Sequence, residues 1–249
     1  SFDTPVTKDL TLYAKWNKLS FTVSFDSKGG SGVASQNVEY NEKAVEPSAP
    51  ILEGYIFGGW YIDEDCNTAY DFNTPVTRSL TLYAEWSPIT YSVVFNKNSE
   101  AAEGTMDAQN FVYDESEGLA ANGFTRTGYT FDGWNTKADG TGKDYADGAS
   151  VSNLSTVNGA TVILYAKWRA NHYTVHFDGN GSTGGSMTDQ NFVYDVAQNL
   201  SANRFERTGY NFSGWSRNPN GEGGSYSDGA EVMNLLTEDG DSITLYAQW

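Results

Sequence analysis

GYTFDGWNTKADG, at residues 128–140, decides how the rest of the sequence is read, because the chain repeats it. A close relative, GYNFSGWSRNPNG, occupies residues 209–221, and a shortened form, GYIFGGW, occupies residues 54–60. Glycines allow positive φ or close packing, and aromatic residues bury large apolar surfaces. The pattern is therefore either a ligand-binding motif used three times or the core signature of a small domain that has been copied.

A second landmark lies outside this motif and recurs at a similar interval. The ending LTLYAKW at 10–16 returns three times, closing on Trp86, Trp168 and Trp249, so that the four closing tryptophans are 70, 82 and 81 residues apart. Self-similarity at a fixed period indicates tandem domains. The sequence predicts the closing strand of an incomplete repeat at 1–16, followed by a short repeat 1 at 17–86, repeat 2 at 87–168 and repeat 3 at 169–249.

The opening and closing segments of each repeat have the period of β-strands. In YTVHF, Tyr173, Val175 and Phe177 alternate with polar residues, and in the closing segment Leu164 and Ala166 alternate with Tyr165 and Lys167. A Gly, Asn and Ser stretch follows each opening strand and leads to a second strand, which predicts a hairpin.

Two segments of repeat 3 are candidates for short helices. VAQNLSANRFERTG, at 196–209, ends on a glycine, and DGAEVMNLL, at 228–236, begins with Asp228 as a possible cap. A small sheet with a short helix predicts an α+β fold for each repeat, with β-structure dominant.

Composition excludes several classes of protein. With 32 Asp plus Glu against 15 Lys plus Arg, the net charge is −17, which opposes binding to nucleic acid or to anionic membrane surfaces. The sequence contains no run of 18 apolar residues and no basic start followed by an apolar stretch. We therefore expect no nucleic-acid partner, no membrane-embedded segment and no signal peptide within this stretch.

Residues that could carry catalysis or bind a metal are few. The single cysteine is Cys66, and His172 and His176 stand four apart on a predicted strand, too far apart for a shared metal. DEDCN at 63–67 and DGNGS at 178–182 alternate oxygen ligands as calcium loops do, but they lack the later glycine and glutamate. We expect no catalysis, no cofactor and no metal site, and the calcium question stays open for these two loops.

The tryptophans decide between the two explanations of the opening motif. All seven lie at repeat landmarks, and a domain of this size needs a set of large buried aromatics to fold. The sequence therefore favours core positions for Trp60, Trp134 and Trp215. The alternative is that these three are exposed and bind a sugar or a protein.

The pattern RTGYTFDGWNTKADGTGKDYADGA…LYAKW resembles the Listeria-Bacteroides repeat, the B-repeat of internalin-type surface proteins, over essentially the whole chain. The resemblance implies a ubiquitin-like β-grasp module that occurs in tandem in secreted or wall-attached bacterial proteins. It also implies adhesion or the spacing of other domains, without catalysis. Repeat 1 departs from this pattern, because YIDEDCNTAYDFNTPVT replaces the longer loop.

Two functions follow as hypotheses. The first is a stalk, an elongated array of repeats that holds other domains of an adhesin away from a bacterial surface, with neighbouring repeats as its contacts. The second is a module that binds a host surface protein or glycan through exposed loops or aromatics. Short linkers favour the stalk. We also expect residues 1–16 to pack on repeat 1 or on a neighbouring chain, because an isolated amphipathic strand is not stable.

Overall fold

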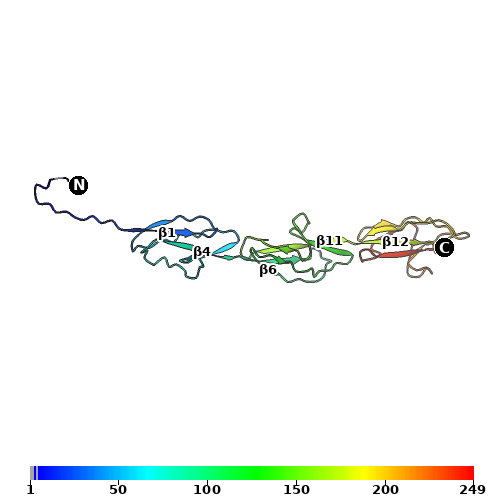
Figure 1. The fold of residues 1–249 in the computed structure, drawn as a ribbon. Coiled ribbons are helices and arrows are strands. Elements are labelled where there is room, and N and C mark those ends of the chain that lie inside the picture. The colour runs from blue at the N-terminus through cyan, green and yellow to red at the C-terminus, as the bar shows by residue number, and fades with distance from the viewer. Residues whose placement is uncertain (1–2, 4) are drawn as a thin grey trace. The chain divides into compact units, whose positions relative to one another are not determined.

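The computed structural model describes Asp3 and residues 5–249 (Figure 1). The chain divides into two compact bodies. The first comprises Ser1–Ile89 with Val112–Asp114 and Ser155–Asn158, and the second comprises Thr90–Phe111, Glu115–Leu154 and Gly159–Trp249.

Sheet 1 has four strands, in the order β2-β1-β4-β3. They are β1 (Ser20–Asp26), β2 (Gln36–Glu39), β3 (Tyr55–Tyr61) and β4 (Leu80–Pro88). The first and last strands, β1 and β4, are central and parallel, whereas β2 and β3 pair antiparallel at the two edges. The hairpin predicted at the start of the repeat is confirmed by the β1–β2 pairing.

Sheets 2 and 3 repeat this arrangement and add a short fifth strand. Sheet 2 has the order β6-β5-β11-β8-β9 and contains β5 (Thr90–Asn96), β6 (Gln109–Val112), β8 (Tyr129–Asn135), β9 (Asp144–Tyr145) and β11 (Thr161–Ala170). Sheet 3 has the order β13-β12-β18-β15-β16 and contains β12 (His172–Asp178), β13 (Gln190–Val193), β15 (Gly214–Ser216), β16 (Ser225–Tyr226) and β18 (Ser242–Gln248). In both sheets the opening and closing strands are again central and parallel.

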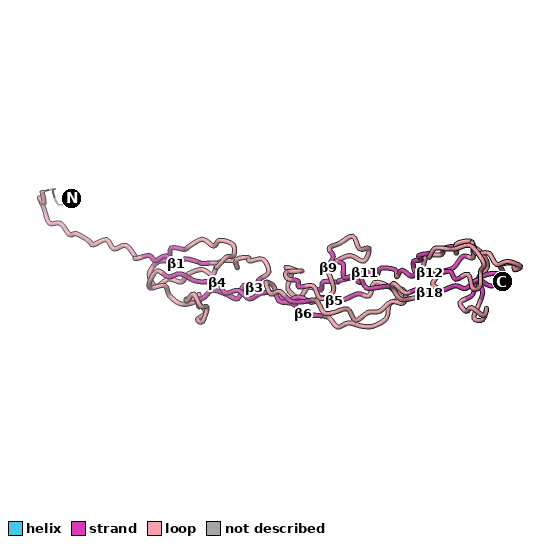
Figure 2. The backbone as a smooth tube through the Cα atoms, turned by 45° about the vertical axis from the view of Figure 1, so that its right-hand side comes forward, coloured by secondary structure: helices cyan, strands magenta, loops and turns pink. Residues whose placement is uncertain are grey.

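The helices expected in repeat 3 are not present, and this part of the prediction was wrong. Figure 2 shows strands and loops but no helix in the described part of the chain. Within 196–209 lies β14 (Gln198–Asn199), and within 228–236 lies β17 (Glu231–Val232). These two strands pair with each other as a small ladder, and sheet 2 is accompanied by an equivalent ladder of β7 (Glu117–Gly118) and β10 (Ser150–Val151).

Side chains that bond to the backbone explain why this segment is not helical. The amide of Gln190 holds the extended chain from β13, since its Oε1 accepts from the N–H of Ser201 and its Nε2 donates to the carbonyl of Asn199. Asp228, expected to cap a helix, accepts instead from the N–H of Asn203 at 2.7 Å. Asn, Ser and Asp side chains that satisfy backbone groups in this way compete with helix formation.

The core of each repeat includes inward-facing residues that the strand periodicity predicted. Tyr91, Val93 and Phe95 on the opening strand and Leu164 and Ala166 on the closing strand are buried in one cluster. Leu200 and Val232, expected on helices, are also buried, but they reach the core of sheet 3 from extended chain. Alternating burial is what the pleat of a half-buried strand requires.

The segment before sheet 1 does not pack on it. Residues 5–19 form no strand and are exposed, including Leu12, Tyr13 and Trp16. The expected packing on repeat 1 is therefore wrong for residues 5–16. Packing on a neighbouring chain stays a prediction, and residues 1, 2 and 4 lie outside the described residues. A physical reason is that both neighbours of β4 in sheet 1 are already taken by β1 and β3, so no central position is open for LTLYAKW.

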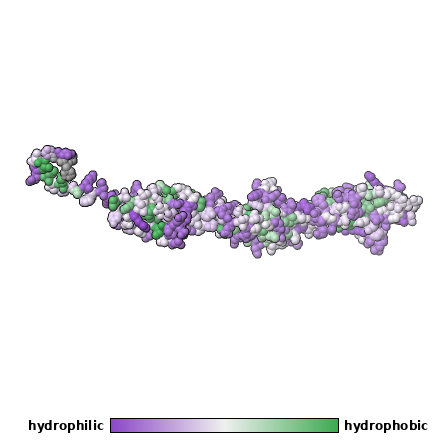
Figure 3. Space-filling view, in the orientation of Figure 1, coloured by the Kyte–Doolittle hydropathy of each residue, from purple (hydrophilic) through white to green (hydrophobic). Residues whose placement is uncertain are grey.

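Most of the face of the repeats visible in Figure 3 is hydrophilic or neutral, in keeping with the acidic composition.

Candidate functional site at the repeat junction

The three tryptophans of the opening motif lie inside their repeats. Trp60, Trp134 and Trp215 are 3%, 0% and 0% exposed. Each indole packs against phenylalanines from two or more strands or loops, as Trp134 does against Phe95, Phe124 and Phe131. The exposure that a binding role requires is not seen, and a ligand site on these side chains stays an untested prediction.

The tryptophans that close the repeats are half-buried and fasten the two ends of each repeat together. The indole N–H of Trp168 donates to the carbonyl of Lys97 at 2.8 Å, and Trp86 and Trp249 make the same bond to Ser27 and Gly179. By contrast, the indole nitrogens of Trp60, Trp134 and Trp215 are buried with no hydrogen-bond partner in the described structure. A buried N–H left unpaired costs about 1–3 kcal/mol, which the burial of a large aromatic offsets.

Sheets 2 and 3 are joined by a single residue, Asn171, between β11 and β12. Its N–H donates to the carbonyl of Gly128 at 2.9 Å, and its carbonyl accepts from the N–H of Tyr194 at 2.9 Å. The antiparallel pairing of β8 with β11 also continues past Trp168, so that Tyr129 lies opposite Ala170. The backbone is therefore hydrogen-bonded through the linker, not only on either side of it.

Side-chain contacts also hold sheets 2 and 3 together beside Asn171. The Tyr129 hydroxyl donates to Asp195 at 2.9 Å, and the rings of Tyr129 and Tyr194 meet edge to face with centroids 5.8 Å apart. Gly128 has φ +75° and lies directly under the Tyr194 ring, so an added Cβ would overlap the ring. We call the set Gly128, Tyr129, Asn171, Tyr194 and Asp195 junction B.

The polar groups of junction B are satisfied within the second body. Asn171 is 5% exposed; its Oδ1 accepts from the Thr130 hydroxyl at 2.6 Å, and its Nδ2 donates to the carbonyl of Thr237 at 2.7 Å. Hydrogen bonds from Asn234 and then from Tyr129 lower the pKa of Asp195. Burial and the bond to Asp195 raise the pKa of Tyr129, so the phenol stays protonated and remains a donor.

An ion pair lies beside this junction. The Arg169 guanidinium bonds both oxygens of Asp239, at 3.3 and 2.9 Å, and the backbone N–H of His172 donates to the same carboxylate at 2.9 Å. The bond from Arg169, followed by that from His172, lowers the pKa of Asp239 to about 2. Charge-assisted and bidentate contacts of this kind fix orientation.

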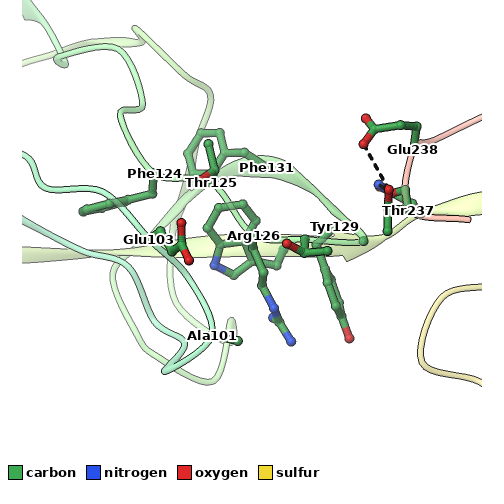
Figure 4. Close-up of a pocket in the computed structure, with 13 residues that line it drawn as sticks. Ala101, Glu103, Phe124, Thr125, Arg126, Tyr129, Phe131, Thr237 and Glu238 are labelled. Carbon is green, nitrogen blue, oxygen red and sulfur yellow. Dashed lines mark hydrogen bonds between the residues drawn. The ribbon is translucent and has the colours of Figure 1, made fainter. Parts of the chain in front are cut away.

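A cavity of about 520 Å³ adjoins junction B (Figure 4). Its walls include Phe131, Trp168, Glu103 and Glu238, and the Arg126 guanidinium carbon stands 3.5 Å from the centroid of the Tyr129 ring. The Nε of Arg126 is buried without a hydrogen-bond partner in the described structure. Aromatic faces, carboxylates and a guanidinium can hold a polar ligand, but nothing in this lining is arranged as a nucleophile with its base.

The first body contains the same contacts at the end of sheet 1, which we call junction A: Gly54, Tyr55, Ile89, Tyr113 and Asp114. The N–H of Ile89 donates to the carbonyl of Gly54 at 2.9 Å, and its carbonyl accepts from Tyr113 at 3.0 Å. Tyr55 donates to Asp114 at 2.8 Å, and its ring meets Tyr113 at 5.8 Å. The hydrogen bond to Asp114 raises the pKa of Tyr55.

Sequence reasoning singled out other residues and missed these. His172 and His176 are not brought together, since each lies nearest its own aspartate, Asp239 or Asp189. Asp63, in the first calcium-like loop, accepts from the backbone of Asn67 and Thr68, and Asp178 in the second accepts from Asn180. The described residues hold no group of three or more His, Cys, Asp and Glu side chains placed to bind a metal. The available signal for the junction was the recurrence of GY in every repeat and of YD in repeats 2 and 3.

Copies of one small mixed sheet, joined by linkers of one residue, define a tandem-repeat protein. The chain belongs to the Listeria-Bacteroides repeat domain family. The sequence model of this family matches three stretches of the chain, residues 21–85, 91–167 and 173–248.

Three longer proteins are similar in sequence to this chain over part of their own length. A "Putative membrane protein" of Evansella cellulosilytica is 33% identical over 98% of the chain, and a "Putative Gly-rich membrane protein" of the same organism is 32% identical over 98%. Internalin H of Listeria monocytogenes is 32% identical over 61%. The chain spans 35%, 26% and 26% of the lengths of these three proteins. In the described residues, no helix is long and apolar enough to cross a bilayer.

Proposed function

We propose that this chain is a non-catalytic spacer in a bacterial cell-surface or secreted protein, an adhesin, and that it holds other domains away from the surface. Junction B carries the proposal. Its backbone ladder, its buried Asn171 and the contact of Gly128 with Tyr194 restrict movement between the second and third repeats. A spacer requires such restriction, because a flexible linker would let its repeats fold back on one another.

The relatives support this role without defining it. Internalin H and the two proteins named as membrane proteins contain a similar region as a minor share of their length. A segment of that size is well suited to position other domains. We propose an extracellular location for the chain on this basis.

We also propose a helix-less β-grasp for each repeat. The order β2-β1-β4-β3, with parallel central strands flanked by a hairpin partner and an antiparallel edge, supports this proposal. A loop with a two-stranded ladder takes the place of the helix in repeats 2 and 3. The boundaries 17–86, 87–168 and 169–249 remain part of this proposal.

Small-angle scattering tests the spacer function. Three repeats in line have a radius of gyration of about 30 Å, whereas a compact globule of this length has about 18 Å. We expect about 30 Å at both low and physiological salt, because short linkers and not charge repulsion hold the repeats apart. A value of about 18 Å would overturn the spacer. A value that contracts strongly with added salt would assign the extension to the net charge.

The second candidate function, binding of a host glycan or surface protein, is favoured by the cavity beside junction B. Trp168, Tyr129 and Phe131 provide apolar walls, and the unpaired Nε of Arg126 provides a donor. A glycan array and a cell-binding assay on the whole chain test it, with Arg126→Gln as the variant. Binding that is lost in this variant supports the module, and binding that is unchanged excludes this cavity.

A further inference from the structure

The strand on which the chain enters each repeat lies beside the strand on which it leaves. In sheet 2 the chain enters along β5 and leaves along β11, and these two pair in parallel from Ser92 opposite Thr161 to Asn96 opposite Tyr165. Sheets 1 and 3 pair β1 with β4 and β12 with β18 in the same way. A pull on the two ends of the chain therefore acts at opposite ends of this ladder.

The parallel arrangement decides how such a pull loads the hydrogen bonds. If the two strands were antiparallel, both points of pull would lie at one end of the ladder, and its bonds would open one at a time. In parallel strands the pull slides one strand along the other, so that the bonds between them carry it together. The ladder of opening and closing strands thus has the geometry of a clamp against tension.

An asparagine side chain extends this clamp in repeats 2 and 3. The amide of Asn98, just after β5, donates to the carbonyl of Ala166 on β11 at 3.1 Å, and Asn180 donates to Ala247 on β18 at 2.8 Å. The amide of Asn98 also donates to the loop carbonyl of Ala138 at 2.9 Å. The asparagine therefore ties the chain after the opening strand to the closing strand.

Repeat 1 has a lysine at this place. Lys28 has the same left-handed backbone as Asn98, with φ 47° against 51°, and its Nζ donates to the loop carbonyl of Glu64 at 2.6 Å. The carbonyl of Ala84 on β4 is approached instead by the Cys66 thiol at 3.7 Å, and a thiol is a weak donor. The closing strand of repeat 1 is thus held less firmly at this end of its ladder.

The other end of the ladder differs in the same direction. In sheet 2 the N–H of Ser92 donates to the backbone carbonyl of Ala160 at 2.9 Å, and Thr174 makes the equivalent backbone bond in sheet 3. In sheet 1 the corresponding N–H, of Thr22, donates to the Ser79 hydroxyl at 3.1 Å. A hydroxyl on a rotatable side chain can follow a sliding strand, so this bond resists the pull less than a backbone bond does.

We propose that each repeat bears tension along the chain through the ladder of its opening and closing strands, and that repeat 1 opens first under load. Its opening lengthens the chain and lowers the tension on repeats 2 and 3. This role rests on the proposed spacer function, because only a chain that is held at both ends is pulled. The strength of the ladders is a separate property and is measured separately.

A single-molecule force experiment on the whole chain, pulled by its two ends, tests the order of opening. The closing tryptophans are 70, 82 and 81 residues apart. At about 3.6 Å of extended chain per residue, the step from repeat 1 is shorter than the others by about 40 Å, which identifies it. We expect the shorter step to occur first and at the lowest force. A longer step that regularly precedes it would overturn the proposed order.

Two asparagine variants of repeat 2 test the clamp under constant force. Asn98→Ala removes the bond across the ladder and should shorten the lifetime of one of the two longer steps about fivefold or more, because the pull must break that bond. The matched control is Asn122→Ala, whose amide bonds the backbone of Phe124 within a loop. We expect this control to leave the lifetime unchanged. Equal shortening in both variants would show that Asn98 contributes to general stability and not to the clamp.

Moving one point of pull tests the geometry itself in repeat 3. With Cys66→Ser to remove the native thiol, handles at His172→Cys and Ser242→Cys pull at the same end of the β12–β18 ladder. Handles at His172→Cys and on a cysteine added after Trp249 pull at opposite ends. The first pair should open the repeat at a force lower by about twofold or more. Equal forces overturn the clamp.

The force and scattering experiments can fail independently. Low forces in both geometries, with a radius of gyration of about 30 Å, overturn the clamp and leave the spacer. The expected forces, with a radius of gyration of about 18 Å, support the ladders as clamps and overturn the spacer.

Discussion

Ile89 and Asn171 occupy the same place in junctions A and B, yet one side chain is apolar and the other is an amide. Around them the contacts agree closely. Each linker N–H lies 2.9 Å from a glycine carbonyl, and each pair of tyrosine rings is 5.8 Å apart. Only Asn171 adds side-chain bonds, to Thr130 and Thr237.

The difference between Ile89 and Asn171 shows that a junction has a constant part, the glycine, the two tyrosines and the acidic residue, and a variable part, the linker side chain. Glycine, both tyrosines and the acidic residue make the contact in either setting, because they act through backbone groups, ring faces and one hydroxyl. The linker side chain only has to fill a buried space and leave no polar group unpaired. Ile89 meets this requirement because its side chain has no polar group. Asn171 meets it because its side-chain oxygen and nitrogen both form hydrogen bonds, with Thr130 and Thr237.

The largest expected effect comes from the constant part. Gly128→Val places a Cβ against the Tyr194 ring and forces valine to a positive φ. The left-handed backbone costs about 1–2 kcal/mol, and the overlap adds about 1–3 kcal/mol. Gly209→Val is the matched control, since it carries the same backbone strain with no ring above it. Chemical denaturation measures both, and equal losses of stability would show that Gly128 does not contact Tyr194 in solution.

Exchanging the linker residues comes next. Ile89→Asn buries an amide in junction A, where Ile56 stands in place of Thr130, and should destabilise the first body by about 2–4 kcal/mol. Asn171→Ile removes two bonds and leaves the Thr237 carbonyl unpaired, at a cost of about 1–3 kcal/mol. Both are read from the unfolding midpoint. If neither variant shifts it, linker burial and junction packing are not coupled.

A smaller effect is expected at the hydroxyl shared by both junctions. Tyr129→Phe and Tyr55→Phe each remove one hydrogen bond to an aspartate and should cost about 1 kcal/mol each. Tyr129→Phe should also raise the pKa of Asp195, although Asn234 continues to lower it. Carboxyl titration by NMR follows this shift. A pKa of Asp195 that does not move would contradict the bond.

The smallest effect concerns pH. Asp239 has a pKa of about 2 in the folded chain against an ordinary 3.8, so its contribution to stability is complete above about pH 4 and is lost as pH falls through about 2. Unfolding midpoints of the parent and of Asp239→Asn, compared between pH 5 and 2, should converge at the acid end. A constant difference over this range would show that the Arg169 pair does not contribute.

Several features follow from the sequence alone. The recurrence of LYA-W endings defined three repeats, and the alternation of Tyr91, Val93 and Phe95 defined which face of each opening strand is buried. The burial of Trp60, Trp134 and Trp215 also followed, because a small repeat has few other large side chains for its core. These are local patterns, repeated often enough to be distinguished from chance.

Other features depended on the tertiary structure. Apolar residues at helical spacing in 196–209 and 228–236 did not form helices, because Gln190, Asn203 and Asp228 bond the backbone in extended form. Junction B was equally hidden, since Tyr129 and Asp195 are 66 residues apart and Arg169 and Asp239 are 70 apart. Periodicity indicates which face of a strand is buried. It does not indicate which distant residue contacts a side chain such as Tyr129, because that depends on how the chain folds in three dimensions.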